Sequence, residues 1–259
     1  MRIIVPIKQI LDPRGITFRR DKERMFINRE EYIMGMSSRA AIEAALRLKD
    51  AMGGEVVALC MGKPQAEDAL REALAVGCDA AYLLSDKAFR EADISVTVRI
   101  LAAAVGKLGG ADLIVTGRES SDTGAGQIGP RLAEALGYAQ VTDAYLLAVE
   151  DGTLQATRRW GNNYAAVQIQ LPAVATVAPE AFPLRYAHGA RIMSAYRDWE
   201  VPVWDAAELG LGEATLVPLL AFRREGFPSP MEVGEVFGGD ASSVAQDVVM
   251  ALKLQKLVG

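Results

Sequence analysis

The chain has few of the residues on which metal sites and hydrolytic centres depend. Its 259 residues include a single histidine, His188, and two cysteines, Cys60 and Cys78. A single histidine excludes a multi-histidine metal site and argues against a Ser-His-Asp triad. Both cysteines lie in apolar stretches, so we expect two buried thiols rather than a disulfide or a ligand pair. We therefore expect neither a bound metal nor a catalytic side chain.

An excess of positive charge and long apolar runs are absent as well. The formal net charge is -5, which argues against a general nucleic-acid binder. No apolar run approaches the roughly 20 residues that a membrane-spanning helix needs. The N-terminus enters a strand-like segment at Arg2, which is not typical of a signal peptide. With 51% hydrophobic residues, the composition indicates a cytoplasmic globular protein with a substantial core.

Predicted strands and helices alternate up to residue 137. Continuous apolar runs predict buried strands at residues 2–7, 55–60, 80–84 and 112–116. Helical spacing of apolar residues predicts helices at residues 39–49, 64–75, 93–108 and 130–137. We expect Ser37 or Ser38 to cap the first helix, Asp93 to cap the third, and Pro130 to open the fourth. The alternation predicts an α/β fold, in which a parallel twisted sheet has helices on both faces.

The segment between the fourth strand and the fourth helix carries the strongest functional signal. Residues 117–129 form a loop rich in Gly, Ser and Thr. A strand, loop and helix in this order point free backbone N–H groups at a ligand beside the sheet, and the helix dipole adds positive potential, which together favour phosphate. The loop is neither a Walker motif nor a G-x-G-x-x-G fingerprint, and its glycines also suit a plain tight connection.

Two other segments are expected to meet this loop in space. Residues 6–8 and 60–62 lie at the ends of predicted parallel strands, and the carboxyl ends of such strands share one edge of the sheet. Ligands of open α/β sheets bind outside that edge. The convergence of the three segments favours a nucleotide site.

The pattern changes near residue 140. Further strands are predicted at residues 143–149, 153–158, 164–170 and 173–177. The dipeptide Asp151-Gly152, between the first two of them, favours a hairpin turn. We expect these strands to form an antiparallel extension of the same sheet. A separate small hairpin is predicted within residues 16–28.

The end of the chain is less regular. Residues 178–198 have no steady period, and residues 205–239 contain scattered Gly and Pro. Ser242 and Ser243 precede a last predicted helix at residues 244–254. A long irregular arm that ends in an amphipathic helix often wraps a partner chain, and packing against its own sheet is the alternative.

We predict two parts on this basis. Residues 1–204 form a nucleotide-binding α/β domain with an antiparallel sheet extension. Residues 205–259 form a C-terminal arm and helix that wrap a partner subunit.

Several segments together resemble the beta subunit of electron transfer flavoproteins. Their order and spacing match over most of the chain, at residues 5–9, 41–49, 61–79, 117–130, 171–174, 185–187 and 192–193. The loop at 117–130 matches the signature loop of that family in length and in Asp122 and Gln127. The resemblance implies a Rossmann-like fold of the adenine nucleotide alpha hydrolase type. It also implies a heterodimer with an alpha subunit, whose carboxyl domain carries the electron-transferring FAD.

The resemblance further implies that this chain itself holds an adenine nucleotide. That nucleotide is AMP in ordinary members of the family and a second FAD in electron-bifurcating members. The implied cofactor-binding residues are Pro6, Gly35, Met36, Ser37, Ser38, Met61, Gly117, Arg118, Glu119, Ser120, Ser121, Asp122, Thr123, Gly124, Ala125, Gly126, Gln127 and Ile128. We expect backbone N–H groups and the loop hydroxyls to hold phosphate. The Asp122 carboxylate is expected to bond loop N–H groups or a ribose hydroxyl, because it would repel phosphate.

The subgroup is open at this point. Residues 84–89, with Asp93 and Thr97, resemble a segment of bifurcating and nitrogen-fixation-type members, which favours a second FAD. In contrast, residues 122–125 depart from the Asp-Gly-Asp-Thr of the family, and residues 35–36 replace its Asn-Pro. Both departures fall in the implied nucleotide site and keep AMP as an alternative.

A redox partner, such as a flavin dehydrogenase, is expected at residues 178–198. In members that serve acyl-CoA dehydrogenases, a loop presents a leucine where this chain has Gly189. We therefore expect a different partner, contacted by Phe182, Arg185 or His188. Alternatively, Arg185 and its neighbour only tether the loop to the sheet. Arg159 either lies near the flavin, where it favours anionic reduced forms, or marks a solvated strand end.

The leading hypothesis is an electron carrier subunit that positions flavin and does no covalent chemistry of its own. If the complex is of the bifurcating type, it would oxidise NADH. The alternative is a stand-alone adenine-nucleotide-binding protein of the stress-protein type with no redox role. An ATP-splitting ligase is disfavoured, because residues 8–13 lack the Ser-Gly-Gly-x-Asp-Ser loop of such enzymes.

Overall fold

The computed structural model describes residues 1–221, 226 and 234–258. The chain divides into two compact units. The first comprises residues 1–19 and 24–223, and the second comprises residues 20–23 and 224–259. The predicted arm at 205–259 therefore lies partly outside the described residues, and residues 205–221 of it belong to the first unit.

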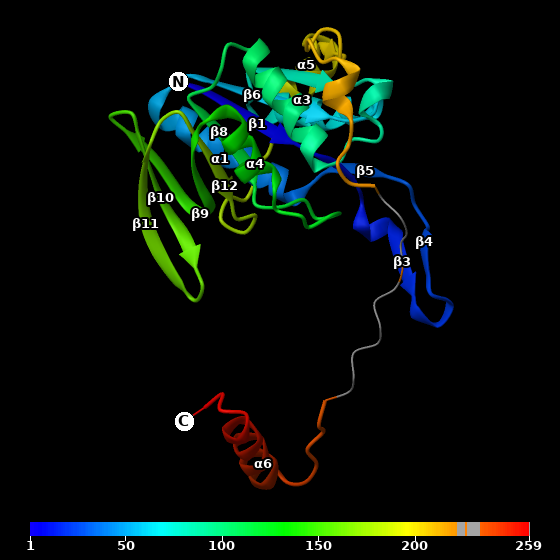
Figure 1. Cartoon of the computed structure of the whole chain (residues 1–259), viewed down its shortest axis with the longest axis vertical. Coiled ribbons are helices and arrows are strands. Elements are labelled where there is room, and N and C mark those ends of the chain that lie inside the picture. Colours follow the sequence, from blue (N-terminus) through cyan, green and yellow to red (C-terminus); the bar gives the residue numbers. More distant parts are fainter. Residues whose placement is uncertain (222–225, 227–233, 259) are drawn as a thin grey trace. The chain divides into compact units, whose positions relative to one another are not determined.

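A nine-stranded sheet forms the centre of the first unit (Figure 1). Its strands are β1 (Arg2–Ile7), β6 (Glu55–Met61), β7 (Ala80–Leu84), β8 (Leu113–Gly117), β9 (Ala139–Glu150), β10 (Thr153–Trp160), β11 (Asn163–Gln170), β12 (Ala173–Val177) and β13 (Val203–Trp204). Their order is β11-β10-β9-β12-β8-β1-β6-β7-β13. In this order, every pairing from β9 through β12, β8, β1, β6 and β7 to β13 is parallel. Strand β10 pairs antiparallel with both β9 and β11. The predicted α/β fold is thus confirmed, and β9, β10 and β11 form the predicted antiparallel extension. The strand predicted at 173–177 was wrongly assigned to that extension, because β12 pairs parallel with both β8 and β9.

Four helices cover the two faces of this sheet. They are α1 (Met36–Met52), α2 (Glu67–Val76), α3 (Ile94–Lys107) and α4 (Ile128–Leu136). Successive residues of a strand point to opposite faces, so Ile3 and Val5 join the core under α1 and α2, while Ile4 joins the core under α3 and α4. A further helix, α5 (Gly189–Arg197), packs against α2.

The shorter elements complete the described chain. Strand β2 (Gln9–Leu11) pairs with β5 (Tyr32–Met34), and β3 (Ile16–Arg19) pairs with β4 (Arg24–Ile27) as the predicted small hairpin. The 3-10 helices are η1 (Pro13–Gly15), η2 (Arg20–Lys22), η3 (Pro64–Ala66), η4 (Lys87–Phe89) and η5 (Glu213–Leu216). The second unit contains α6 (Ala241–Leu254), which confirms the last predicted helix. Within the described residues, no helix has the length and apolar character of a membrane span.

Three predicted helix starts are wrong. Helix α1 begins at Met36 after Gly35, and Ser38 Oγ accepts a hydrogen bond from the backbone N–H of Lys8 instead of capping the helix. Helix α4 begins two residues before Pro130. In α6, Asp240 is the cap and accepts from the N–H groups of the two serines that follow.

Both thiols are buried, as predicted. Cys60 lies on β6 and Cys78 follows α2, and both are free. Burial raises the pKa of Cys60 to about 11 and that of Cys78 to about 12. Neither thiol is therefore ionised at neutral pH, and both act as small apolar residues.

Gly129 and Gly106 offer a matched test of this packing. A Cβ at Gly129 in α4 would lie 2.3 Å from Thr176 Cγ2, whereas a Cβ at Gly106 in α3 would meet nothing within 4 Å. We expect Gly129→Ala to lower the free energy of unfolding by about 1–3 kcal/mol through overpacking. We expect Gly106→Ala to raise it by up to about 1 kcal/mol, because alanine favours helix. Urea unfolding of both variants measures the two effects, and a loss of stability in both would contradict this assignment.

Candidate functional site

A cavity of about 940 Å³ lies at the carboxyl ends of three neighbouring parallel strands. Pro6 and Ile7 from the end of β1, Met61 from the end of β6, and Gly117 from the end of β8 all line it. The three segments that were predicted to converge therefore do so. Three elements separated in sequence supply one wall each, because parallel strands place their carboxyl ends at one edge.

Most of the residues implied by the family resemblance line this cavity: Pro6, Ser37, Ser38, Met61, Gly117, Arg118, Glu119, Ser120, Thr123, Ala125, Gly126, Gln127 and Ile128. The others, Gly35, Met36, Ser121, Asp122 and Gly124, lie outside the lining. Gly35 precedes α1, and its N–H donates to the carbonyl of Lys8.

Close backbone packing shapes the floor of the cavity. A Cβ at Gly117 would lie 2.4 Å from Ser37 Cβ, so only glycine lets the end of β8 approach the first turn of α1 this closely. The loop that follows Gly117 is held by hydrogen bonds between its own residues. The Gly124 N–H donates to the Ser120 carbonyl over 2.7 Å, and the hydroxyls of Ser120 and Thr123 lie 2.7 Å apart. Gly126 has a φ of 62°, a left-handed conformation that favours glycine.

An ion pair joins this loop to the end of β1. Lys8 Nζ lies 2.7 Å from Asp122 Oδ2, and Lys8 also lines the cavity. Desolvation favours a higher pKa for Asp122, but the bonds from Lys8 and Ser120 outweigh it and lower that pKa. Asp122 was expected to bond loop N–H groups or a ribose hydroxyl, and the structure adds an ion pair with Lys8 that neutralises its charge.

One part of the cavity lining, residues 218–221, had no signal of its own in the sequence. Residues 218–221, from the irregular stretch that follows η5, line the cavity together with the first turns of α3. Ile94, Thr97 and Leu101 are the lining residues from that helix. Family resemblance drew attention to Asp93 and Thr97, but residues 218–221 carry no periodicity that would place them.

Comparison with known proteins agrees with this geometry. A family model described as the electron transfer flavoprotein domain matches residues 25–209. The chain belongs to the electron transfer flavoprotein family, among its beta subunits. The predicted resemblance is thus confirmed.

Relatives from several organisms share this family. The electron transfer flavoprotein subunit beta of Clostridium acetobutylicum is 36% identical over 216 residues, which is 83% of each chain. The caffeyl-CoA reductase-Etf complex subunit CarD of Acetobacterium woodii is 32% identical over 263 residues, covering 100% of each chain. Protein FixA of Azorhizobium caulinodans is 36% identical over 218 residues, which is 82% of this chain and 77% of that protein.

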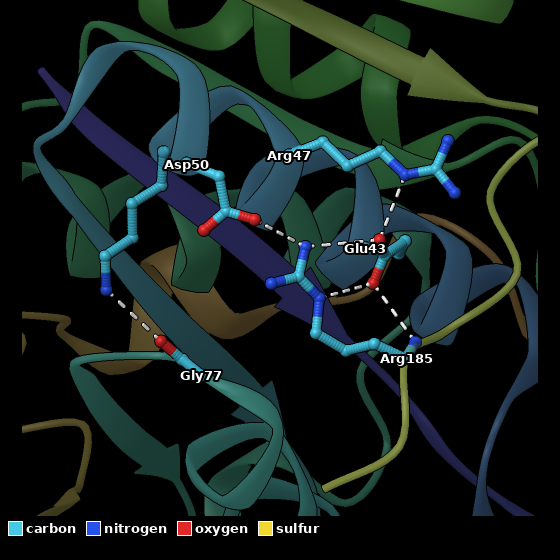
Figure 2. Close-up of polar contacts among 6 residues, drawn as sticks. Glu43, Arg47, Asp50, Gly77 and Arg185 are labelled. Carbon is cyan, nitrogen blue, oxygen red and sulfur yellow. Dashed lines mark hydrogen bonds and ion pairs between the residues drawn. The ribbon is translucent and has the colours of Figure 1, made fainter.

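Arg185 ties the segment before α5 to helix α1, as Figure 2 shows. Its Nε lies 2.9 Å from Glu43 Oε2, and its Nη2 lies 2.8 Å from Asp50 Oδ2. Arg47 Nε donates to the other oxygen of Glu43 over 3.0 Å. Arg185 was expected either to contact a redox partner or to tether its loop to the sheet. The geometry agrees with a tether, but one that joins the loop to helix α1 and not to the sheet.

The other residues expected to meet a redox partner differ in exposure. Phe182 is buried, with the guanidinium of Arg47 above its ring, so it is not available to a partner. His188 Nδ1 accepts from the Ala190 N–H and so caps α5. Tyr186, next to the tether, is fully exposed. Arg159 is exposed at the end of β10, where its Nη1 lies 3.4 Å from the Tyr145 hydroxyl.

Glu43→Gln tests the tether. Glu43 is buried, and glutamine would leave both arginines without their shared carboxylate, so the free energy of unfolding at pH 7 should fall by about 2 kcal/mol. Desolvation favours a higher pKa for Glu43, but the bonds from Arg185 and Arg47 lower it below 4.5. A carboxyl with a lowered pKa adds stability above its unfolded-state pKa and loses it as the pH falls through the folded-state pKa. The difference between the wild type and the variant should therefore shrink as the pH falls below about 4.5.

Glu67→Gln is the matched control. Glu67 pairs with Arg71 one turn along α2, and its side chain is 37% exposed, so its loss should cost about 0.5 kcal/mol or less. Denaturant unfolding of the three proteins across pH 3–7 provides the comparison. Equal losses for the two variants would contradict a special role for Glu43.

Proposed function

We propose that this chain is the beta subunit of an electron transfer flavoprotein that pairs with an alpha subunit and carries electrons between a dehydrogenase and a downstream acceptor. An adenine nucleotide occupies the cavity beside β1, β6 and β8. The convergence of three strand ends and the loop at 117–128 on that cavity is the observation that carries the proposal. Membership of the electron transfer flavoprotein family supplies the redox role.

The chain's own groups suit the phosphate part of such a ligand. Residues of the loop and of the first turn of α4 line the cavity together with Lys8 and Arg118. Helix starts and free backbone N–H groups favour anions. Arg118 forms ion pairs with two carboxylates, Asp143 at 3.1 Å and Glu119 at 3.3 Å. Lys8 forms an ion pair with Asp122, so we expect Lys8 to be the main cation for the phosphate.

FAD suits this cavity better than AMP. The cavity of about 940 Å³ is lined by the loop at 117–128, by the start of α3 and by residues 218–221, and Ile94, Leu101 and Leu219 contribute apolar side chains to the lining. A mononucleotide would leave much of this volume to water, whereas a dinucleotide adds a large ring system that suits apolar side chains. The resemblance of residues 84–89, Asp93 and Thr97 to bifurcating and nitrogen-fixation-type members also favours this choice.

A bound flavin supplies the electron-transfer chemistry, and this chain supplies its position. The residues around the cavity bind and orient the nucleotide and keep water from its apolar parts. No side chain of this chain forms a covalent bond in the proposed role. Residues 178–198 form the surface for a redox partner, with Tyr186 exposed beside the tether.

The C-terminal part suits assembly with the alpha subunit. Helix α6 has no buried residue, and Val249, Met250 and Leu254 are among its exposed apolar side chains. An amphipathic helix of this kind gains stability by packing against another surface. Within residues 205–259, we assign the part that ends in α6 to wrapping the alpha subunit in the cytoplasm, because residues 206–216 pack on this chain's own core.

Nucleotide content is the direct test of this proposal. The chain is co-purified with its alpha subunit, and the nucleotides are released by denaturation and quantified by chromatography. We expect two FAD and no AMP per heterodimer. One FAD and one AMP would show that this chain holds AMP, and an absence of both from this chain would overturn the nucleotide site.

Charge changes at the edge of the cavity should act in opposite directions. Lys8→Gln leaves the Asp122 carboxylate uncompensated and should weaken nucleotide binding by about 1 kcal/mol, a roughly fivefold rise in Kd. Asp122→Asn frees the ammonium of Lys8 and should lower Kd by a similar factor. Both effects should shrink at high salt. Titration of nucleotide-depleted heterodimer with FAD measures them.

Lys49→Gln is the control for these variants. Lys49 Nζ lies 2.6 Å from Asp79 Oδ1 in a similar ion pair, and neither residue lines the cavity. Lys49→Gln should therefore leave the Kd for FAD unchanged. A shift of the same size in this control, or shifts of one sign for both cavity variants, would contradict the proposed position of the phosphate.

A further inference from the structure

Residues 217–221 lie against the start of α3 with little apolar burial of their own. Val217, Leu219 and Leu220 are 57%, 71% and 66% exposed. Residues 218–221 nevertheless form one wall of the cavity. A segment with so few buried apolar contacts depends on polar contacts to keep its place.

Asp93 provides the main polar contact through its two oxygens. Its Oδ1 accepts from the Val96 N–H over 2.8 Å and thereby caps α3. Its Oδ2 accepts from the N–H groups of Leu219 and Leu220, over 2.8 and 3.0 Å. One carboxylate thus joins the first turn of the helix to the segment that follows η5. Hydrogen bonds to a charged acceptor are stronger than those to a neutral one.

Arg99 makes a second attachment farther along α3. Its Nη1 donates to the carbonyl of Thr215 over 2.6 Å and lies 3.4 Å from that of Val217. Leu216, between these two, packs against the core under α3 and α4. These contacts fix the chain up to residue 217 independently of Asp93. The position of the next residues, which include Leu219 and Leu220, depends on Asp93.

From these contacts we propose that Asp93 is a positioning residue for the nucleotide. Its Oδ2 holds residues 218–221 as a wall of the cavity, and the attachment of that wall sets the rate at which a bound dinucleotide leaves. The part that concerns the dinucleotide rests on the proposed function. The attachment itself is a property of the chain alone.

Asp93→Asn separates the two tasks of this side chain. Asparagine caps a helix about as well as aspartate, so its single carbonyl oxygen can retain the bond from Val96. The amide nitrogen that replaces the second oxygen cannot accept from Leu219 and Leu220. Asp93→Ser makes the same separation by length, because serine caps a helix but is too short to reach the segment.

Asp86 offers a matched control elsewhere in the fold. Its Oδ1 accepts from the Ala88 N–H over 2.9 Å, and its Oδ2 accepts from the Ala206 N–H over 3.0 Å. It is therefore another carboxylate that caps a helix with one oxygen and holds the chain after β13 with the other. Neither Asp86 nor Ala206 lines the cavity. Asp86→Asn changes the same chemistry without changing the wall.

Two measurements on the heterodimer test the proposal. Amide hydrogen exchange of peptides that cover residues 217–221 should be at least about tenfold faster in both Asp93 variants than in the wild type. Dissociation of FAD, followed by its fluorescence after dilution, should be about five- to tenfold faster. Asp86→Asn should match the wild type in both, and the thermal midpoints of the Asp93 and Asp86 variants should agree.

Each other outcome overturns part of the proposal. Unchanged exchange at residues 217–221 would show that Asp93 does not hold the segment. Faster exchange with unchanged FAD dissociation would show that the segment does not retain the ligand. Faster exchange throughout α3 would mean that Asp93 acts only as a helix cap. A wild-type heterodimer that holds neither FAD nor AMP in this chain would overturn both the proposed function and the role of Asp93 in retaining the ligand. Amide hydrogen exchange would then still test whether Asp93 holds residues 218–221.

Discussion

The parallel pairing of β1 with both β6 and β8 is the constraint on which the site depends. It brings the ends of three strands, separated by about 50 residues each in sequence, to one edge of the sheet. Backbone geometry alone then decides that Lys8, Met61 and Gly117 border one cavity. The side chains that follow each strand can vary while the edge persists, which is why α/β sheets of this kind hold many ligands at the same place.

Much of this architecture could be predicted from residue patterns. Long apolar runs and helical periodicity placed β1, β6, β7, β8 and α3, because full burial on both faces or on one stripe leaves a strong periodic signal. The antiparallel extension followed from alternation and from a turn that favours Asp-Gly. The prediction for Cys60 and Cys78 rested on the same apolar contexts.

Other features depend on partners that no local pattern reveals. Ser38 looked like a helix cap, but its hydroxyl accepts from Lys8, thirty residues away. Asp122 was expected to bond its own loop or a ribose hydroxyl, and the pattern gave no sign of its ion pair with Lys8, which follows β1. Strand β13 has two residues and no period, and the N–H groups of Leu219 and Leu220 are held by Asp93, more than 120 residues away in sequence. Polar contacts between residues far apart in sequence can be identified only in the folded structure.

The two carboxylates at Asp86 and Asp93 hold the stretch that follows β13 only by its main chain. An amide N–H is common to every amino acid except proline, so these attachments place no demand on the identity of residues 206, 219 and 220 beyond excluding proline. Natural variation can therefore remodel the side chains that this stretch presents to a ligand without loosening its anchorage. A family that keeps the two aspartates retains a fixed frame on which ligand preference is free to diversify.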